Sequence, residues 1–254
     1  MKWLRGLVLP VLLLATWELL TRYHLVNVRL LVEPGRVVAT FLRELREGEL
    51  LSQLGASLAR DLGGATLGSA AGILVGTAMG TSRFYDRLLG SSFHAAKQVA
   101  IFAWIPLMSV WLGTGEPAKV VFIALSAFYP VVLNTFEGIR SVGSQYVEVA
   151  RVFRFTRLQV FRRVILPGAA PSILAGIQVA LVYSWLATIG AEYLLAAGPG
   201  IGNLMIDGRE HFRMDMVLLG VFVVGLVGYT LNWIASRIEA RALAWRGRSV
   251  AQFN

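Results

Sequence analysis

Residues 146–181 read YVEVARVFRFTRLQVFRRVILPGAAPSILAGIQVAL, and this stretch changes character halfway along. Its first half mixes arginines with apolar residues at helical spacing, which predicts two short amphipathic helices, over 148–153 and 157–165. After Pro167 the charges disappear and a long apolar run begins. Because proline is tolerated in the first turn of a helix, we expect a membrane-spanning helix to start there. The stretch therefore predicts a surface knob that leads into the membrane.

The composition of the whole chain supports a membrane protein. Hydrophobic residues make up 56% of the 254 residues and charged residues only 15%, where soluble domains carry roughly 25% charged residues. The mean hydropathy is +0.63. A soluble fold of this size could not bury so much apolar surface, so lipid must solvate part of it. The absence of cysteine excludes disulfides and thiolate metal sites.

Six apolar stretches are long enough, at about 20 residues each, to cross a membrane as helices. They cover residues 7–25, 58–79, 88–112, 118–136, 168–196 and 216–235. The first could be a signal peptide, but no small-residue cleavage site follows it, and Trp17, Glu18 and Arg22 favour a retained helix. We therefore expect an all-α polytopic membrane protein with six transmembrane helices, in which residues 1–254 form a single transmembrane domain.

The basic residues sort to one side of these spans. If the N-terminus lies in the cytoplasm, the inner segments hold fourteen basic and four acidic residues, a net charge of +10. The outer segments balance to zero, which is the distribution that the positive-inside rule expects. The net charge of +9 thus indicates an orientation, with both termini and loop 137–167 in the cytoplasm, rather than an affinity for nucleic acid.

Glycines recur at every fourth position of the second span. They are Gly64, Gly68, Gly72, Gly76 and Gly80. This spacing places small surfaces on adjoining turns and predicts close packing against another helix of the same chain, with a dimer contact or a moving helix as the alternative. Prolines inside the third and fourth spans, Pro106 and Pro130, predict bends.

A few polar and ionisable side chains fall inside the expected spans. Lys97 lies in the third span with His94 and Gln98 beside it. In the fifth span Glu192 follows Gln178 and Ser184. A charge within a bilayer is expensive unless it is paired or faces water. These six residues therefore predict a polar lining for a passage, and the alternative is a set of salt bridges and snorkelling side chains that only orient helices.

No catalytic constellation is visible in the sequence. The chain has no G-x-x-x-x-G-K-[ST] loop to cradle phosphate, and GTGEPAK at 113–119 has the wrong ending. H-E-x-x-H and G-x-S-x-G are also missing, and three scattered histidines make no metal site. We therefore expect neither an enzyme nor a metal-binding protein.

The loop resembles the EAA loop of ABC-importer permeases, whose pattern is E-A-A, then a glycine, then I-x-x-P. Glu148, Val149 and Ala150 match E-A-A with one conservative change, and Ile165 and Pro167 fall at the closing end with looser spacing. Further stretches look like the nitrate/sulfonate/taurine branch of the family. They are VEPGRVVATF (32–41), WIPLMSVWLGTGEPAKVVFIALSAFYPVVLNTFEGIRSV (104–142), FRRVILPGAAPSILAGIQVAL (161–181) and AEYLLAAGPGIGNLM (191–205).

The resemblance implies the type I ABC-importer permease fold in a bacterial inner membrane. Two copies of the chain, as a homodimer or with a close partner, would form the pathway within the lipid. A cytoplasmic ABC ATPase dimer, which would hold the ATP and magnesium, would grip the knob at 146–165, and an extracytoplasmic solute-binding protein would deliver the solute. The implied coupling residues are Glu148, Val149, Ala150, Arg151, Arg154, Arg157, Arg162, Arg163 and Pro167. The implied solute is a small anion such as an aliphatic sulfonate, taurine or nitrate, to which Lys97 would offer a favourable charge.

One position departs from the family pattern. Where these permeases usually have glycine, this sequence has Arg154. Glycine serves the bend between the two short helices, so arginine must either adopt an ordinary backbone conformation or tolerate strain. Its side chain could reach an acidic residue of the ATPase or simply be a solvated charge.

A different class of function stays open: an ATP-independent channel or secondary transporter. Such a protein would need sites for coupling ions or an internal inverted repeat, and the sequence shows no repeat. Uptake by the purified chain without ATP would favour it. A membrane-embedded enzyme is a further alternative, but the sequence shows no paired catalytic groups for it. A purely structural membrane subunit is another, and failure to co-purify with any ATPase would favour it.

Overall fold

The computed structural model describes residues 2–23, 25–27, 31–195 and 198–244, and every regular element within them is a helix. The long helices are α1 (Lys2–Arg22), α3 (Glu49–Thr81), α6 (Glu116–Arg140), α9 (Leu166–Leu195) and α11 (Met214–Ala242). The short elements are α2 (Pro34–Glu47), α4 (Arg83–Ala96), η1 (Ile101–Trp104), α5 (Ile105–Leu112), α7 (Ser144–Val152), α8 (Arg157–Val160), η2 (Phe161–Ile165) and α10 (Ile201–Glu210). The all-α expectation is confirmed for these residues.

Four helices are long and apolar enough to cross a membrane. They are Glu49–Thr81, Glu116–Arg140, Arg157–Leu195 and Met214–Ala242, and the bent pair Arg83–Ala96 and Ile101–Leu112 makes a fifth if it counts as one span. Helix α1 covers most of the first predicted span, but it is not among these, and residue 24 of that span lies outside the described residues. The predicted number of six transmembrane helices is therefore not confirmed.

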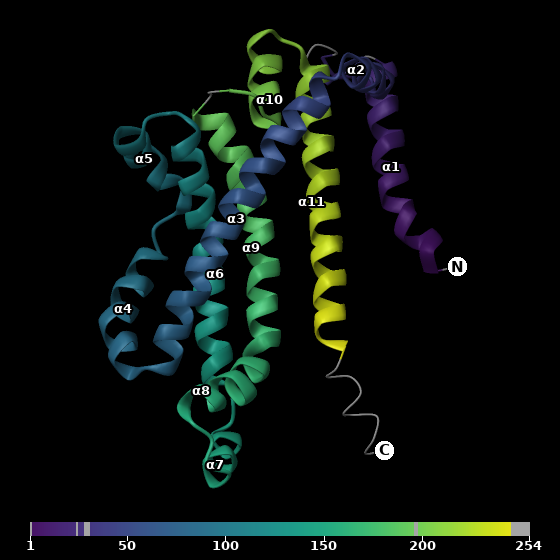
Figure 1. The fold of residues 1–254 in the computed structure, drawn as a ribbon. Coiled ribbons are helices and arrows are strands. Elements are labelled where there is room, and N and C mark those ends of the chain that lie inside the picture. Colours follow the sequence, from purple (N-terminus) through teal and green to yellow (C-terminus); the bar gives the residue numbers. More distant parts are fainter. Residues whose placement is uncertain (1, 24, 28–30, 196–197, 245–254) are drawn as a thin grey trace.

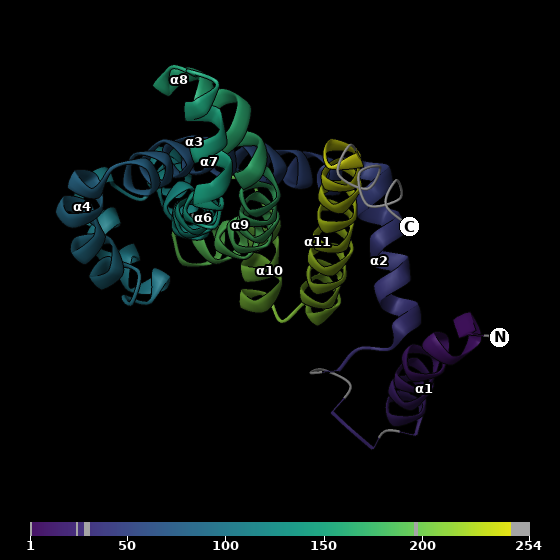
Figure 2. The ribbon, with the colours of Figure 1, turned by 90° about the horizontal axis from the view of Figure 1, so that it is seen from below.

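Helices α3, α6 and α9 form the centre of the bundle, and α1 stands at its periphery (Figures 1 and 2). The glycine spacing of α3 explains the contact with α6. A Cβ atom added to Gly64 would lie 2.5 Å from Cγ2 of Ile123, and one added to Gly72 would lie 2.8 Å from Cβ of Val131. Real Cβ atoms essentially never approach so closely, so the missing side chains permit this distance between helix axes. The prediction of close packing within the chain is confirmed.

The prediction of one continuous helix over 88–112 is wrong. Helix α4 ends at Ala96, and the segment that resumes at Ile101 is bent by 95° from it. Pro106 does not bend a helix here but sits in the first turn of α5, where its missing N–H leaves no helical bond unmade. Pro130, by contrast, lies inside α6 as predicted.

The predicted knob differs from the observed one in two respects. Its first helix begins earlier than expected, at Ser144, and ends at Val152. Its second helix, predicted as separate over 157–165, is continuous with the next membrane helix as Arg157–Leu195. Helix α9 itself begins at Leu166, one residue before the predicted start at Pro167, but helical backbone precedes it without a break. The chain passes through the wide π turn of η2 just before this proline, and such a turn accommodates a residue without a backbone N–H.

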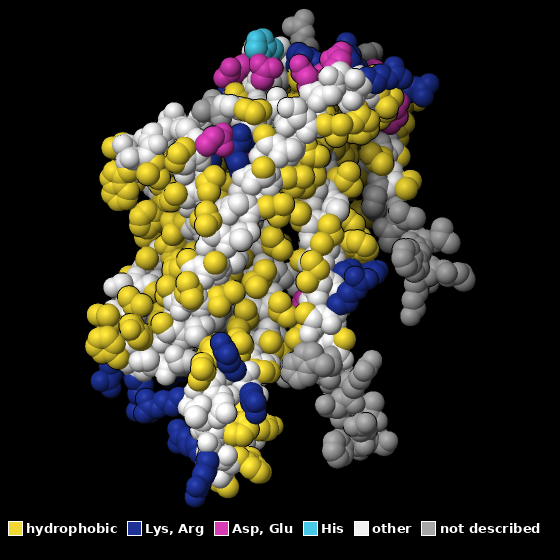
Figure 3. Space-filling model, in the orientation of Figure 1, with side chains coloured by type: hydrophobic (Ala, Val, Ile, Leu, Met, Phe, Trp, Pro, Cys, Tyr) yellow, Lys and Arg dark blue, Asp and Glu magenta, His cyan; other side chains and the backbone are white. Residues whose placement is uncertain are grey.

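Charged side chains separate along the long axis of the bundle. In Figure 1, α7 and α8 lie at one end and α2 and α10 at the other. Figure 3 shows basic side chains gathered at the α7 end, whereas acidic ones and a histidine gather, with some basic ones, at the opposite end. This is the asymmetry that the positive-inside rule describes. The location of both termini in the cytoplasm stays a prediction.

Candidate functional site

Helix α7 ends in a Schellman turn centred on Arg154. The N–H of Arg154 donates to the carbonyl of Arg151 at 2.8 Å, and the N–H of Phe155 donates to the carbonyl of Ala150 at 3.0 Å. This pairing requires a left-handed residue after the helix, and Arg154 adopts φ +55°. The conformation costs a non-glycine residue roughly 1–2 kcal/mol. The departure from glycine at this position thus preserves the glycine geometry, at the cost of strain.

The following helix begins with a capping box. The hydroxyl of Thr156 accepts from the N–H of Gln159 at 3.3 Å, and the side-chain carbonyl of Gln159 accepts from the N–H of Thr156 at 2.8 Å. The two reciprocal bonds satisfy backbone donors that a helix start leaves unpaired. The Schellman turn that ends α7 and the capping box that begins α8 are therefore adjacent in sequence. Together they fix the angle between the two helices of the knob.

The knob exposes apolar side chains beyond the end of the bundle. Ala150 is buried, but Val149, Val152 and Phe153 are 56%, 82% and 72% exposed. A groove of about 780 Å³ lies beside them, between α7 and the start of α9. Large apolar residues exposed together on a tip are typical of a protein-binding surface.

The other residues with an expected coupling role surround this tip. Glu148, Arg151, Arg157 and Arg162 are exposed, and Pro167 is half-buried. The guanidinium of Arg163 is also exposed and lies over the ring of Phe155, 5.6 Å from its centre. The structure therefore brings the predicted set together on one projection.

The expected pathway residues do not converge on one place. Lys97 and Gln98 lie in the break between α4 and η1, and both line a cavity of about 450 Å³ that reaches α6 and α9. Ser126 and Tyr129 of α6 and Tyr183 of α9 add polar groups to its wall. Lys97 is half-buried at the edge of this cavity, most of whose other lining residues, such as Phe102 and Leu133, are apolar.

The remaining expected pathway residues lie elsewhere. His94 is exposed on α4. The side-chain amide of Gln178 donates to Asn232 at 3.1 Å and to Ser236 at 2.7 Å, both on α11. Ser184 is buried, and its hydroxyl bonds to its own helix. The bonds of Gln178 match the alternative in which polar side chains hold helices together.

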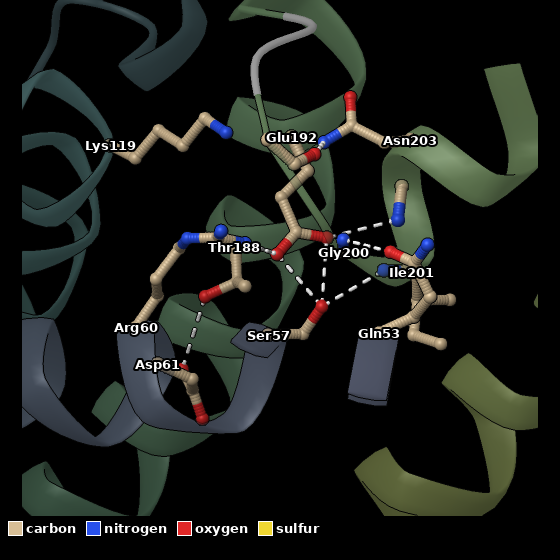
Figure 4. A network of polar contacts seen from close by, with 12 residues as sticks. Gln53, Ser57, Arg60, Asp61, Lys119, Thr188, Glu192, Gly200, Ile201 and Asn203 are labelled. Atoms are coloured by element: carbon tan, nitrogen blue, oxygen red, sulfur yellow. Dashed lines mark hydrogen bonds and ion pairs between the residues drawn. The ribbon is translucent and has the colours of Figure 1, made fainter. Parts of the chain in front are cut away.

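Glu192 is the centre of a buried polar network near the α10 end of the bundle (Figure 4). Its carboxylate accepts from the hydroxyl of Ser57 at 2.7 Å, from Nη1 of Arg60 at 2.6 Å and from the N–H of Gly202 at 2.9 Å. The side chain of Glu192 is fully buried. These bonds join α3, α9 and the start of α10, so Glu192 orients helices in this conformation.

The network extends to a second carboxylate that the sequence analysis did not single out. The guanidinium of Arg60 also contacts Glu116 of α6, with Nε···Oε2 at 2.5 Å and Nη2···Oε1 at 2.8 Å. Lys119 approaches the same carboxylate at 3.8 Å. The available signal was that Arg60 and Asp61 both fall inside the expected span 58–79. A charge in that position requires a partner, and the partners come from distant segments.

Known families and proteins match most of the length of the chain. Residues 68–243 match the model of the family described as binding-protein-dependent transport system inner membrane component. The taurine transport system permease protein TauC of Escherichia coli (strain K12) is 31% identical over 240 residues, which are 92% of this chain and 87% of TauC. SsuC of Bacillus subtilis (strain 168), provisionally named as an aliphatic sulfonates transport permease protein, is 35% identical over 244 residues, 96% of this chain and 88% of SsuC.

Solved structures show a similar fold at lower sequence identity. A chain of the MetNI methionine ABC transporter in an inward-facing conformation superposes with a TM-score of 0.62 at 20% identity, covering 76% of this chain and 95% of that one. A chain of an amino acid ABC transporter crystallised with histidines gives a TM-score of 0.66 at 18% identity, covering 79% and 98%. These likenesses concern the arrangement of the helices.

Proposed function

The chain belongs to the family of binding-protein-dependent transport system inner membrane components, in its nitrate/sulfonate/taurine branch, and from this premise we propose that it forms the translocation pathway of an ATP-driven importer for a small anion. Members of this family are permease components, and a separate ATPase hydrolyses the ATP. ATP and magnesium would therefore be held by that partner. The anion is an aliphatic sulfonate, taurine or nitrate, which are the solutes named for relatives.

The observation that carries the proposal is the knob formed by α7 and the start of α8. It projects from the basic end of the bundle and combines exposed apolar side chains, such as Val152 and Phe153, with the exposed carboxylate of Glu148. We assign it as the handle that a cytoplasmic ATPase grips. The connection between its two helices is fixed by the turn at Arg154 and the capping box at Thr156, so the knob can transmit force as a rigid unit.

The mechanism follows from two such knobs, one on each permease of a homodimer. ATP binding would close the two ATPase subunits and draw the knobs together, and the continuous helix Arg157–Leu195 would carry this motion through the membrane. The pathway would then open outward to the solute-binding protein, and hydrolysis would reset it. The ATPase and the binding protein would act at opposite ends of the helix bundle, so each would bias the same two-state equilibrium.

The pathway itself would pass the cavity at the break between α4 and η1. Lys97 would provide a positive charge at depth, and the amide of Gln98 and the hydroxyls of Ser126 and Tyr129 would provide hydrogen-bonding groups for an oxyanion. We expect both termini in the cytoplasm of a bacterial cell. The polar network at Glu192 would lie toward the outer side, where it holds α10 against the bundle.

The test is a reconstituted complex of the permease with its ATPase and binding protein in phospholipid vesicles. Uptake of labelled taurine, an alkanesulfonate and nitrate would each be measured with ATP, without ATP, and with methionine as a control solute. We expect uptake of one of the three anions that depends on ATP and on the binding protein. Uptake by the permease alone without ATP would contradict the proposal and favour a channel or secondary transporter.

A further inference from the structure

A second pocket lies beneath the knob, on the side that faces α3. It has a volume of about 870 Å³ and lies between the last turns of α3 and the segment from α7 to η2. Thr77 and Thr81 line it from α3, where that membrane-spanning helix ends. The pocket therefore lies at the depth where a bilayer changes from hydrocarbon to headgroups. It lies on the opposite face of α7 from the groove described above, with Phe155 lining both.

Two arginines from different elements meet at this pocket. Arg151 comes from α7 and Arg157 from the first turn of α8, and both side chains are exposed. Among the described residues neither forms an ion pair, and the hydroxyl of Thr77 has no hydrogen-bond partner either. Two guanidinium groups and a free hydroxyl therefore offer donors for a phosphate oxyanion, and none of the described residues supplies an anion to the two arginines.

The rest of the lining is apolar. Leu158, Phe161 and Ile165 extend along the α8–η2 segment, and Val147 and Phe155 face them from the α7 side. Leu158 is 58% exposed, so this wall is open to the surroundings. A small hydrophilic anion would contact only the arginines and threonines. An amphiphile would contact these polar groups and the apolar side chains as well. The lining thus matches a molecule with an anionic head and a hydrocarbon chain.

We propose that this pocket binds one anionic phospholipid per chain, with its phosphate between Arg151 and Arg157 and the first part of an acyl chain along Leu158 and Phe161. Basic pockets beside membrane helices on the cytoplasmic side are suited to such lipids. The bound headgroup would bridge α7, α8 and the end of α3. It would hold the knob against the membrane while leaving the apolar tip at Val152 and Phe153 for the ATPase. The assignment to the inner leaflet rests on the orientation in the proposed function.

The test is native mass spectrometry of the complete permease–ATPase complex released from vesicles of phosphatidylcholine with phosphatidylglycerol. We expect one phosphatidylglycerol to be retained per permease, and phosphatidylcholine not to replace it. The double variant R151Q/R157Q should lose it, because two arginines at a membrane surface contribute affinity on the order of thirtyfold. The double variant R83Q/R87Q, on exposed arginines of α4 outside the pocket, removes the same charge and should retain the lipid.

Three results would overturn the assignment. In the first, R151Q/R157Q retains as much phosphatidylglycerol as the unaltered chain. In the second, inorganic phosphate displaces the lipid, which would make the pocket a site for the free anion. In the third, R151Q/R157Q loses the ATPase in vesicles of phosphatidylcholine alone, which would make the arginines part of the ATPase contact. Failure of the unaltered permease to co-purify with any ATPase would instead contradict the proposed function, and lipid retention could be measured independently of it.

Discussion

Nη1 of Arg60 lies 2.6 Å from a carboxylate oxygen of Glu192, and the two side chains are 7% and 0% exposed. The ion pair joins α3 to α9 across more than a hundred residues of sequence. A buried charge that loses its partner is costly, whereas an exposed one is not. We therefore expect the bundle to lose stability when one member of this pair is replaced.

Replacing Arg60 with methionine should destabilise the folded state by about 3–5 kcal/mol, because Glu192 would keep a buried charge without its cation. Replacing both residues with apolar ones should cost less than the single change. The control is Arg140→Met, whose partner Asp86 lies at 3.2 Å with both groups partly exposed, and which should cost at most about 1 kcal/mol. Denaturant unfolding in detergent measures all three. Equal effects of Arg60→Met and Arg140→Met would contradict the prediction.

The glycine face of α3 gives a prediction with a control in the same helix. A Cβ added to Gly72 would lie 2.8 Å from Cβ of Val131, whereas one added to Gly63 meets nothing within 4 Å. Gly72→Ala should therefore push α3 from α6 and cost roughly 1–3 kcal/mol. Gly63→Ala should be neutral or stabilise by up to about 1 kcal/mol. The midpoint of thermal unfolding in detergent measures both effects. Equal midpoints for Gly72→Ala and Gly63→Ala would show that the contact of Gly72 with α6 does not matter for stability.

The left-handed backbone of Arg154 predicts an order among three residues at this position. Arg154→Gly should relieve roughly 1 kcal/mol of strain, and Arg154→Val should add strain, because β-branched residues fit the left-handed region worst. Amide hydrogen exchange of residues 153–157 in the purified permease should slow in the glycine variant and quicken in the valine variant. Identical exchange in all three chains would show that the turn does not control the order of the knob.

The positive charge of Lys97 is expected to promote passage of the anion. Lys97→Ala should reduce anion uptake by the reconstituted complex on the order of tenfold, which is the typical contribution of a hydrogen bond to a charged group. Lys97→Arg should keep most of the uptake, since the positive charge remains at the cavity. Arg87→Ala, on exposed α4, is the matched control. Uptake by Lys97→Ala equal to that of the control would return Lys97 to a role in helix orientation.

Much of the fold follows from local patterns in the sequence. Apolar length predicted the helices that cross the bundle, and the four-residue glycine spacing predicted the packing of α3. The break after Ala96 and the fusion of α8 with α9 were not predicted, because they depend on how neighbouring helices pack and not on the local run of apolar residues. A proline in the sequence does not by itself show where a helix begins. Pro106 lies in the first turn of α5, whereas helical backbone continues on both sides of Pro167.

The candidate site likewise has one part that the sequence predicts and one part that it does not. The knob is local in sequence, so its residues could be found together, and even the strained position Arg154 was visible as a departure from glycine. The network around Glu192 is not local. Its partners Ser57 and Arg60 come from α3 and Gly202 from α10, and only the fold brings them within hydrogen-bond distance of Glu192 on α9.

The central claim is that an ATPase drives this permease through α7, and Glu148 provides its most direct test. Its carboxylate is exposed on α7, and Glu148→Arg reverses the charge of that surface without removing a buried contact. Glu137→Arg, at an exposed position of α6, is the control of equal charge change. The measurement is solute-stimulated ATP turnover by the reconstituted complex. We predict that Glu148→Arg lowers it to the rate without solute while Glu137→Arg preserves it; full stimulation in the Glu148→Arg complex would contradict the account.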